Sequence, residues 1–327
     1  MSQQTRTIPS GAMRFNSDSQ KLEYWNGSAW FQIHTFSPTL DGGARGLAYR
    51  GGSNQIDVIT IPTQGNATDF GDASISAGGR HMASSNTRSI AAGGGTPSRV
   101  DTIDFVTFPS TGNAQDFGNL TQVGAGGGQM GMSNQTRGVF GGRTTPGNSN
   151  TIDFITIATE GNAVDFGDQG NTEGGMNCFS SPTRGIMGGA HPSRTPRIEF
   201  ITIPTTGNSQ EFGDMLHDQE LSGAASSATR GMWMGGSYPT VISTIQYVQI
   251  QTLGNAVSFG DLTSAVNDLG GMSDCVRGIA YGGSGSPSGR NIIDYFPIAT
   301  GGTATDFGDA QATAGYACNS NGHGGLG

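Results

Sequence analysis

Lysine is almost absent from this sequence. Lys21 is the only lysine, and lysine and arginine together number 16 against 25 aspartates and glutamates. The net charge of −9 gives no overall attraction for nucleic-acid phosphates or anionic membranes, so we expect no nucleic-acid partner. No apolar run approaches the roughly 20 residues of a membrane span, and the N-terminal MSQQTRTIPSGAMRF lacks the apolar core of a signal peptide.

Cysteine and histidine are scarce as well. The three cysteines (Cys178, Cys275 and Cys318) form no CxxC pair, and we predict reduced thiols made in a reducing cytoplasm. The five histidines fall at unrelated positions with no HxH or HExxH spacing, which argues against a zinc site. Because a GxSxG elbow and a phosphate-binding GxxxxGK[ST] loop are also missing, we expect no catalytic residue, no metal, no cofactor and no enzyme.

Glycine is what the sequence has in excess, at 56 of 327 residues against a usual share of roughly 7%. Charged residues make up only 13%, whereas a disordered chain combines low hydrophobicity with high charge. The glycines do not follow the every-third-residue period of collagen. This composition favours an all-β protein with many turns and short strands.

One segment recurs six times, as in GNATDFGD (65–72) and GNAVDFGD (161–168). Its phenylalanines lie 46 to 49 residues apart and are Phe70, Phe117, Phe166, Phe212, Phe259 and Phe307. A β-branched and aromatic stretch such as IDFITI (152–157) precedes each copy and predicts a strand covered on both faces. An internal repeat of about this length is typical of propeller blades or solenoid coils.

Further upstream in each unit, an arginine leads a short apolar stretch into a glycine pair, as in RGVFGG (137–142). These arginines are Arg45, Arg88, Arg137, Arg184, Arg230 and Arg277. In all units but the first, a stretch rich in glycine and serine comes before the arginine and predicts a fourth, closely packed strand. Four strands in about 47 residues predict one blade of a six-bladed β-propeller over residues 39–327, while a β-solenoid ranks second.

The two ends of the repeat region support a closed ring. The first unit enters at LDGGARG (40–46) with its glycine-rich strand short or missing, and GYACNSNGHGGLG (315–327) supplies an extra copy after the sixth Phe-Gly. Pairing of this C-terminal strand with the first blade would hide both open edges.

The order of strand, glycine pair, strand, turn and aromatic resembles the kelch repeat. Gly141 and Gly142 precede Phe166, and Gly188 and Gly189 precede Phe212, with the kelch layout. The Phe-Gly-Asp element replaces the usual kelch tyrosine and tryptophan, so the resemblance implies a kelch-like fold and not membership of the kelch family.

Residues 1–38 form a separate predicted module. Within PSGAMRFNSDSQKLEYWNGSAWFQI (9–33), the motif around Gly11–Asn16 and Leu22–Trp30 resembles a small β-hairpin module of phage tail and fibre proteins. Two strands alone are only marginally stable, so we expect the aromatics Phe15, Tyr24, Trp25 and Trp30 to dock on the chain's own propeller or on another subunit. The tracts of the GNAxDFGD type also resemble repeat proteins of marine phages, cyanophages included.

The repeated polar residues have two interpretations each. The acidic residues beside each phenylalanine could bind calcium, but we favour turn capping by Asp and Asn. The six arginines could form a ring for an anion, but we favour a structural role in which each binds a carboxylate or carbonyl in its own or the next blade.

The loops after each glycine pair vary in length and content, and loops on a rigid scaffold commonly carry recognition. They are rich in proline, serine and arginine. We select as candidate recognition residues Arg143, His191, Arg194, Arg197 and Tyr238.

These features lead to one functional expectation. They predict a non-enzymatic phage virion structural protein, a tail-fibre, tail-tip or capsid-surface component assembled in the host cytoplasm, which attaches to other virion proteins through residues 1–38 and self-associates. The displayed propeller would serve host attachment, through a surface glycan or protein, or particle decoration. The alternatives are a carbohydrate-binding receptor-recognition propeller and a cellular kelch-type protein-interaction scaffold.

Overall fold

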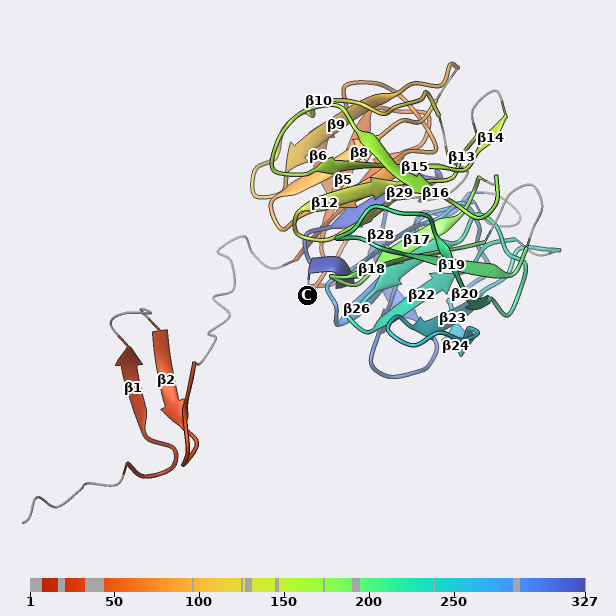
Figure 1. The fold of residues 1–327 in the computed structure, drawn as a ribbon. Helices are drawn as coiled ribbons and strands as arrows, with labels where there is room; N and C mark the ends of the chain where they lie inside the picture. Colours follow the sequence, from red (N-terminus) through yellow and green to blue (C-terminus); the bar gives the residue numbers. More distant parts are fainter. Residues whose placement is uncertain are drawn as a thin grey trace, which may run out of the picture. The chain divides into compact units, whose positions relative to one another are not determined.

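The protein is an all-β chain in two compact units, residues 1–41 and 42–327. This computed structural model describes residues 8–16, 21–32, 44–95, 97–124, 126, 131–144, 147–172, 174–189, 195–237, 239–284 and 289–326. The predicted boundary between residues 38 and 39 therefore lies outside the described residues. Figure 1 shows the short strands of both units.

The first unit contains a three-stranded antiparallel sheet in the order β1 (Met13–Asn16), β2 (Lys21–Trp25) and β3 (Trp30–Gln32). The hairpin predicted here therefore has a third strand. The β2–β3 turn is capped by the Asn26 side chain, whose Oδ1 accepts hydrogen bonds from the backbone N–H groups of Ser28 and Ala29, both at 2.8 Å.

The second unit consists of four-stranded antiparallel sheets with one common strand order, as the repeat predicts, and a two-stranded hairpin of β13 (Arg143–Thr144) and β14 (Asn148–Ser149). The strand that begins with the repeated arginine comes second in each sheet. The second strands are β4 (Arg45–Arg50), β8 (Arg88–Ala92), β12 (Arg137–Phe140), β18 (Arg184–Gly188), β22 (Arg230–Met234) and β26 (Arg277–Tyr281).

The Ile-Asp stretch forms the third strand of each sheet and is buried on both faces, as its sequence predicts. The third strands are β5 (Gln55–Thr60), β9 (Thr102–Thr107), β15 (Thr151–Thr156), β19 (Arg197–Thr202), β23 (Thr244–Gln249) and β27 (Ile292–Pro297). The Phe-Gly-Asp element forms the fourth strand, which is β6 (Thr68–Asp72), β10 (Gln115–Asn119), β16 (Val164–Asp168), β20 (Gln210–Asp214), β24 (Val257–Asp261) and β28 (Thr305–Asp309).

The glycine- and serine-rich stretch forms the first strand and is almost wholly buried. These first strands are β7 (His81–Ser84), β11 (Gly131–Ser133), β17 (Asn177–Ser180), β21 (Gly223–Ser226), β25 (Gly270–Ser273) and β29 (Tyr316–Ser320). Their small side chains allow close approach of neighbouring backbones. A Cβ on Gly131 would lie 1.8 Å from the Met82 carbonyl oxygen of the neighbouring sheet, and one on Gly271 would lie 2.2 Å from that of Ala224.

The C-terminal strand belongs to the sheet of the first strands in this unit. Residues Tyr316–Ser320 of β29 align antiparallel with Gly46–Arg50 of β4, which is the pairing that the sequence predicts. Figure 1 shows blue β29 among strands from the early, orange part of the chain. A 3-10 turn, η1 (Gly324–Leu326), follows and contacts β11, β17 and β21.

The apolar core lies between sheets. One cluster joins Ile90, Ile103 and Phe117 of one sheet to Phe140 and Ile155 of the next. Another joins the last sheet to the first, through Ile279, Ile293 and Phe307 on one side and Ile59 and Cys318 on the other. A single four-stranded sheet has no core of its own here, so each depends on its neighbours for burial.

Candidate functional site

The repeated phenylalanines are core residues. All six are buried, and most meet an aromatic ring of the adjacent strand edge to face, as Phe154 and Phe166 do at 5.8 Å between ring centroids. The glycine after each phenylalanine lies at a β-bulge, with φ of 149° at Gly118. A Cβ there would lie 2.4 Å from the Gly161 carbonyl oxygen, so the Gly-Asn of the next unit packs directly on this bulge.

The Gly-Asn element hydrogen-bonds to the preceding sheet. Its glycine N–H donates to the repeated phenylalanine carbonyl, from Gly161 to Phe117 at 2.8 Å for example. Its asparagine Oδ1 accepts from the backbone N–H after the bulge, from Asp168 to Asn208 at 3.0 Å and, across the ends of the repeat, from Asp309 to Asn66 at 3.0 Å. The Asn part of the predicted turn capping is thus seen as a contact between sheets, in which the asparagine side chain accepts and the Asp backbone donates, while capping by the Asp side chains stays a prediction.

The repeated arginines bind carbonyl oxygens of the next sheet, the structural role that we favoured. Arg137 Nη1 donates to Ile203 O at 3.0 Å, and Arg184 Nη1 donates to Ile250 O at 3.1 Å. Arg277 in the last sheet reaches Ile61 O at 3.2 Å in the first. Most also stack on an aromatic ring of their own sheet, as Arg137 does over Phe154 with 4.8 Å from Cζ to the centroid.

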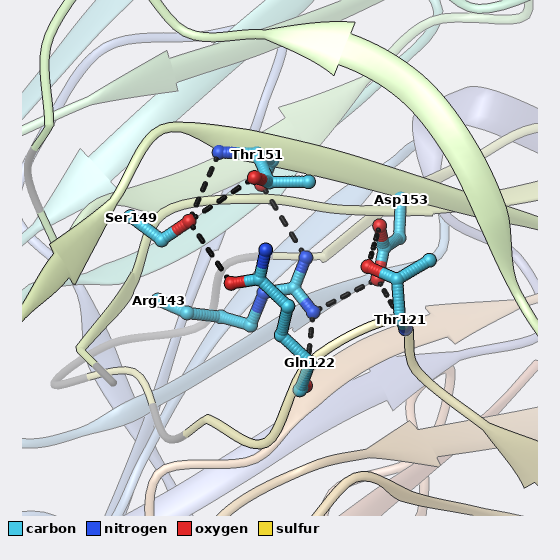
Figure 2. A network of polar contacts seen from close by, with 6 residues as sticks. All are labelled: Thr121, Gln122, Arg143, Ser149, Thr151 and Asp153. Atoms are coloured by element: carbon cyan, nitrogen blue, oxygen red, sulfur yellow. Dashed lines mark hydrogen bonds and ion pairs between the residues drawn. The ribbon is translucent and has the colours of Figure 1, made fainter. Parts of the chain in front are cut away.

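A third repeated contact rests on a buried polar residue of the Ile-Asp strand. Every sheet has one, fully removed from solvent, and the six are Asp57, Asp104, Asp153, Glu199, Gln246 and Asp294. Asp153 accepts bonds from Thr121 N at 3.0 Å and Thr121 Oγ1 at 2.7 Å, in the segment that enters its sheet from the preceding one (Figure 2). Asp153 therefore fixes the connection between these two sheets.

The counter-ions of these acids come from different loops. Arg143 Nη1 lies 2.8 Å from Asp153 Oδ2 with neither side chain exposed, and Arg143 also donates to Gln122 O at 3.2 Å (Figure 2). Arg80 pairs with Asp104, and Arg290 pairs with Asp294. At Asp57 the partner is the Tyr281 hydroxyl at 2.9 Å, and burial raises the pKa of this carboxyl above its ordinary value.

Two of the predicted recognition residues pair with these buried acids. Arg143 is wrong as a recognition residue, because its guanidinium is enclosed against Asp153. Arg197 has a side chain 36% exposed and pairs with Glu199 at 2.8 Å, so it too neutralises a buried acid. His191, Arg194 and Tyr238 lie outside the described residues.

A ring of serines was missed in the sequence, although its spacing follows the repeat. The six residues end the first strands and are Ser84, Ser133, Ser180, Ser226, Ser273 and Ser320. Five donate their hydroxyl to the carbonyl of the preceding serine, at 2.5–3.0 Å, with Ser84 donating to Ser320. They line a narrow cavity of about 50 Å³.

His323 interrupts this ring at Ser133. Its Nε2 lies 3.1 Å from Ser133 Oγ, and its Nδ1 accepts from the Gly325 N–H at 3.1 Å, so Nε2 carries the proton in the neutral ring. Burial lowers the pKa of His323 to about 4. The C-terminal turn therefore closes one end of the serine-lined cavity with an uncharged imidazole.

The predicted attachment residues divide between two faces of the first unit's sheet. Trp25 and Trp30 form one pair, at 5.5 Å between ring centroids, and Arg14 Cζ lies 4.2 Å over Trp30. Arg14 also pairs with Glu23 at 2.8 Å. Hydrogen bonds from Asn16 and Arg14 hold the pKa of Glu23 below its ordinary value. This face satisfies its own polar groups.

The other face is apolar and open. The strand register places Met13, Tyr24 and Phe31 in one row and Phe15 opposite Leu22 in the next. Their exposed fractions are 60% for Met13, 65% for Phe15, 40% for Tyr24 and 47% for Phe31. We call these five residues the apolar face of the first unit.

The thiols and the possible metal ligands remain to be considered in the part of the chain that is described. There, Cys178, Cys275 and Cys318 are free thiols, as expected, and burial raises the pKa of each thiol for which a shift is resolved, Cys178 and Cys275. No three His, Cys, Asp or Glu side chains of the described ranges gather in a way that could hold a metal ion. No helix among the same residues has the length and apolar character to cross a bilayer.

Comparison with known proteins adds no relative: neither a family model nor a curated protein matches this chain.

Proposed function

We propose that this chain is a non-enzymatic structural protein of a phage virion, in a tail fibre, tail tip or capsid-surface fibre. A six-bladed, kelch-like β-propeller, residues 42–327, is displayed on the particle, and residues 1–41 attach it to other virion proteins. The observation that carries the proposal is the apolar face of the first unit, an exposed apolar patch on a small three-stranded sheet.

The ring architecture has its own support. The first strands contact one another in the cyclic order β7, β11, β17, β21, β25, β29 and again β7. The Gly-Asn element and the repeated arginine each make the same contact from the last sheet to the first as between successive sheets. Six equivalent sheets with equivalent neighbours on both sides fit a closed propeller.

The repeated residues have structural uses that leave no need for a catalytic role. Arginines, asparagines and acids of the repeat are occupied in contacts between sheets. The glycan-binding alternative is weakened, because Arg143, one of its candidate recognition residues, is buried. A rigid disc with a separate apolar attachment sheet favours display over chemistry.

Incorporation into the particle tests the proposal. We expect the double variant Phe15→Ser/Phe31→Ser to fold its repeat unit normally, by circular dichroism and thermal unfolding, yet to be lost from purified virions. The matched control is Val164→Ser/Val257→Ser, which removes two exposed apolar side chains from the outer strands of the repeat unit. Normal incorporation of the first variant, or absence of the wild-type chain from virions, would refute the attachment role.

A further inference from the structure

A second, larger cavity lies at the opposite ends of the first strands from the serine ring. It has a volume of about 360 Å³, which is within the range of small-molecule sites and many times the ~30 Å³ of one water. Its wall includes side chains just before β21, β25 and β29 and on the flanking strands, namely Tyr49, Leu221, Ser222, Asp268, Leu269 and Tyr316.

Two residues of this wall occupy a backbone conformation that suits glycine. At the corresponding place in other units stand Gly79, with φ of 63°, and Gly175, with φ of 71°. Leu221 has φ of 57° and Asp268 has φ of 53°, and the Asp268 N–H donates to Leu221 O at 2.8 Å. An L-residue in this region costs on the order of 1 kcal/mol that glycine avoids. Side chains are thus retained here against the local backbone preference.

One carboxylate of the cavity wall has no partner. The Asp268 side chain is exposed and lines the cavity, and its carboxylate has no hydrogen-bond or ion-pair partner among the described residues. Ser222 is buried, and its hydroxyl has no hydrogen-bond partner in the described part of the chain. The surroundings of Asp268 raise the pKa of its carboxyl through desolvation, which also strengthens its attraction for a cation.

The rest of the wall decides which cation fits. Arg80 also lines the cavity, but its guanidinium is occupied by Asp104 and by the Ile75 carbonyl. Leu221, Leu269 and the two tyrosines supply apolar surface beside the carboxylate. One carboxylate is too few for a calcium site, which takes six to eight oxygens. An ammonium on an aliphatic stem matches a single carboxylate and apolar walls.

We propose that this cavity binds a primary ammonium group on an aliphatic chain, with the Asp268 carboxylate as its counter-ion. A free aliphatic amine and a lysine side chain of a partner protein carry this same group. Leu221 and Leu269 contact the stem. The site is independent of whether the chain is a virion protein.

The test is a calorimetric titration of the full chain at constant ionic strength. The probes are n-butylammonium chloride, the peptide acetyl-Gly-Lys-Gly-amide and, as the uncharged control, 1-butanol. We expect an ammonium probe to bind at least about tenfold more tightly than butanol. Binding of butylammonium alone would favour a free amine as the source, and binding of the peptide alone would favour a partner's lysine. Equal binding of charged and neutral probes, or no binding of either ammonium, would overturn the proposal.

Variants separate a binding role from a structural one. Asp268→Asn keeps the side-chain shape, and we expect it to weaken ammonium binding at least about tenfold. Asp268→Gly should do the same while the unfolding temperature stays or rises, because the backbone strain is relieved. Leu221→Gly relieves the same strain and keeps the carboxylate but removes an apolar wall contact, so it should weaken binding of the ammonium and of butanol by a similar factor. Undiminished binding by both Asp268 variants would rule out the carboxylate as the counter-ion.

Discussion

At the scale of single residues, the buried Asp153 and Arg143 show how this protein accommodates charge in its interior, through an ion pair and hydrogen bonds. Asp153 and Arg143 are both fully buried, and each binds the other and neighbouring hydrogen-bond partners. In the sheet of β21–β24 the same task is performed without charge. There, Gln246 Oε1 accepts from Leu216 N at 2.8 Å, and Gln246 Nε2 donates to Gln219 Oε1 at 2.6 Å.

Breaking the Arg143–Asp153 pair on one side should therefore be costly. We expect Arg143→Gln to destabilise the protein by about 3–5 kcal/mol, because it leaves an uncompensated buried carboxylate. The double variant Arg143→Gln/Asp153→Gln, which copies the uncharged pair of Gln219 and Gln246, should recover part of this loss. Urea unfolding measures both free energies. A double variant no more stable than the single one would show that charge is not the reason for the loss.

His323 should make stability depend on pH. Its pKa is about 4 in the folded chain against an ordinary value near 6.5, so between these values the unfolded state binds the extra proton. The free energy of unfolding should fall as pH drops from about 6.5 to about 4, by up to roughly 3 kcal/mol. Above a pH of about 6.5, His323 should cause no change of the free energy of unfolding with pH.

The matched variant for this effect is His323→Gln, which stays neutral throughout. Carboxylates titrate near the lower end of the same window, so the informative quantity is the difference between the two proteins in urea unfolding at each pH. Parallel curves for the two would contradict the role of His323.

At the scale of elements, the outer strand of each sheet is shaped by its neighbour. The bulge after the repeated phenylalanine brings its glycine against the Gly-Asn turn of the next unit, and the turn also bonds to the strand. This contact covers part of a strand edge that would otherwise offer unpaired backbone groups to other chains.

Two glycines of this element allow a matched comparison. Gly118 has φ of 149°, and a Cβ there would lie 2.4 Å from the Gly161 carbonyl oxygen. Gly112 has a similar φ of 155° but nothing within 4 Å of an added Cβ. We expect Gly118→Ala to destabilise the protein by about 1–3 kcal/mol more than Gly112→Ala in thermal or urea unfolding. Equal effects would mean that backbone conformation alone, and not the contact between sheets, requires glycine.

At the scale of the whole molecule, stability depends on the C-terminal strand. Strand β29 completes the sheet of β4 and contributes Tyr316 and Cys318 to the cluster shared with the last sheet. A chain ending at Ala314 would lose both, together with one serine of the ring. The sheet of β4–β6 is therefore completed by β29, a strand from the last segment of the chain.

Truncation should show this dependence. We expect a chain ending at Ala314 to lose cooperative unfolding, because the contacts removed are comparable in worth to the about 5–15 kcal/mol that stabilises a typical domain. A chain ending at Ser320 keeps the pairing with β4 and removes only the turn with His323, so it should fold with a smaller loss. Differential scanning calorimetry compares the two. Cooperative unfolding of the shorter chain would contradict this dependence.

The sequence by itself determined the all-β class, the repeat, the strands and the pairing of the C-terminal strand with the first. These follow from local properties that recur: stretches of β-branched and aromatic residues, glycine turns and a spacing of 46 to 49 residues. The buried role of the repeated phenylalanines and the contacts of the repeated arginines also follow, because the same neighbours recur in each unit.

Only the tertiary structure decided which groups the loop arginines contact and which residues line the two cavities. Arg143 and Arg197 look solvent-exposed in a loop rich in proline and serine, yet the need of a buried acid for a counter-ion turns them inward. Asp268 stands where other units have glycine, and only the approach of β21, β25 and β29 places it at the wall of a cavity. A repeat predicts what its units share, whereas these sites arise from residues that break the repeat and meet only when distant sheets come together.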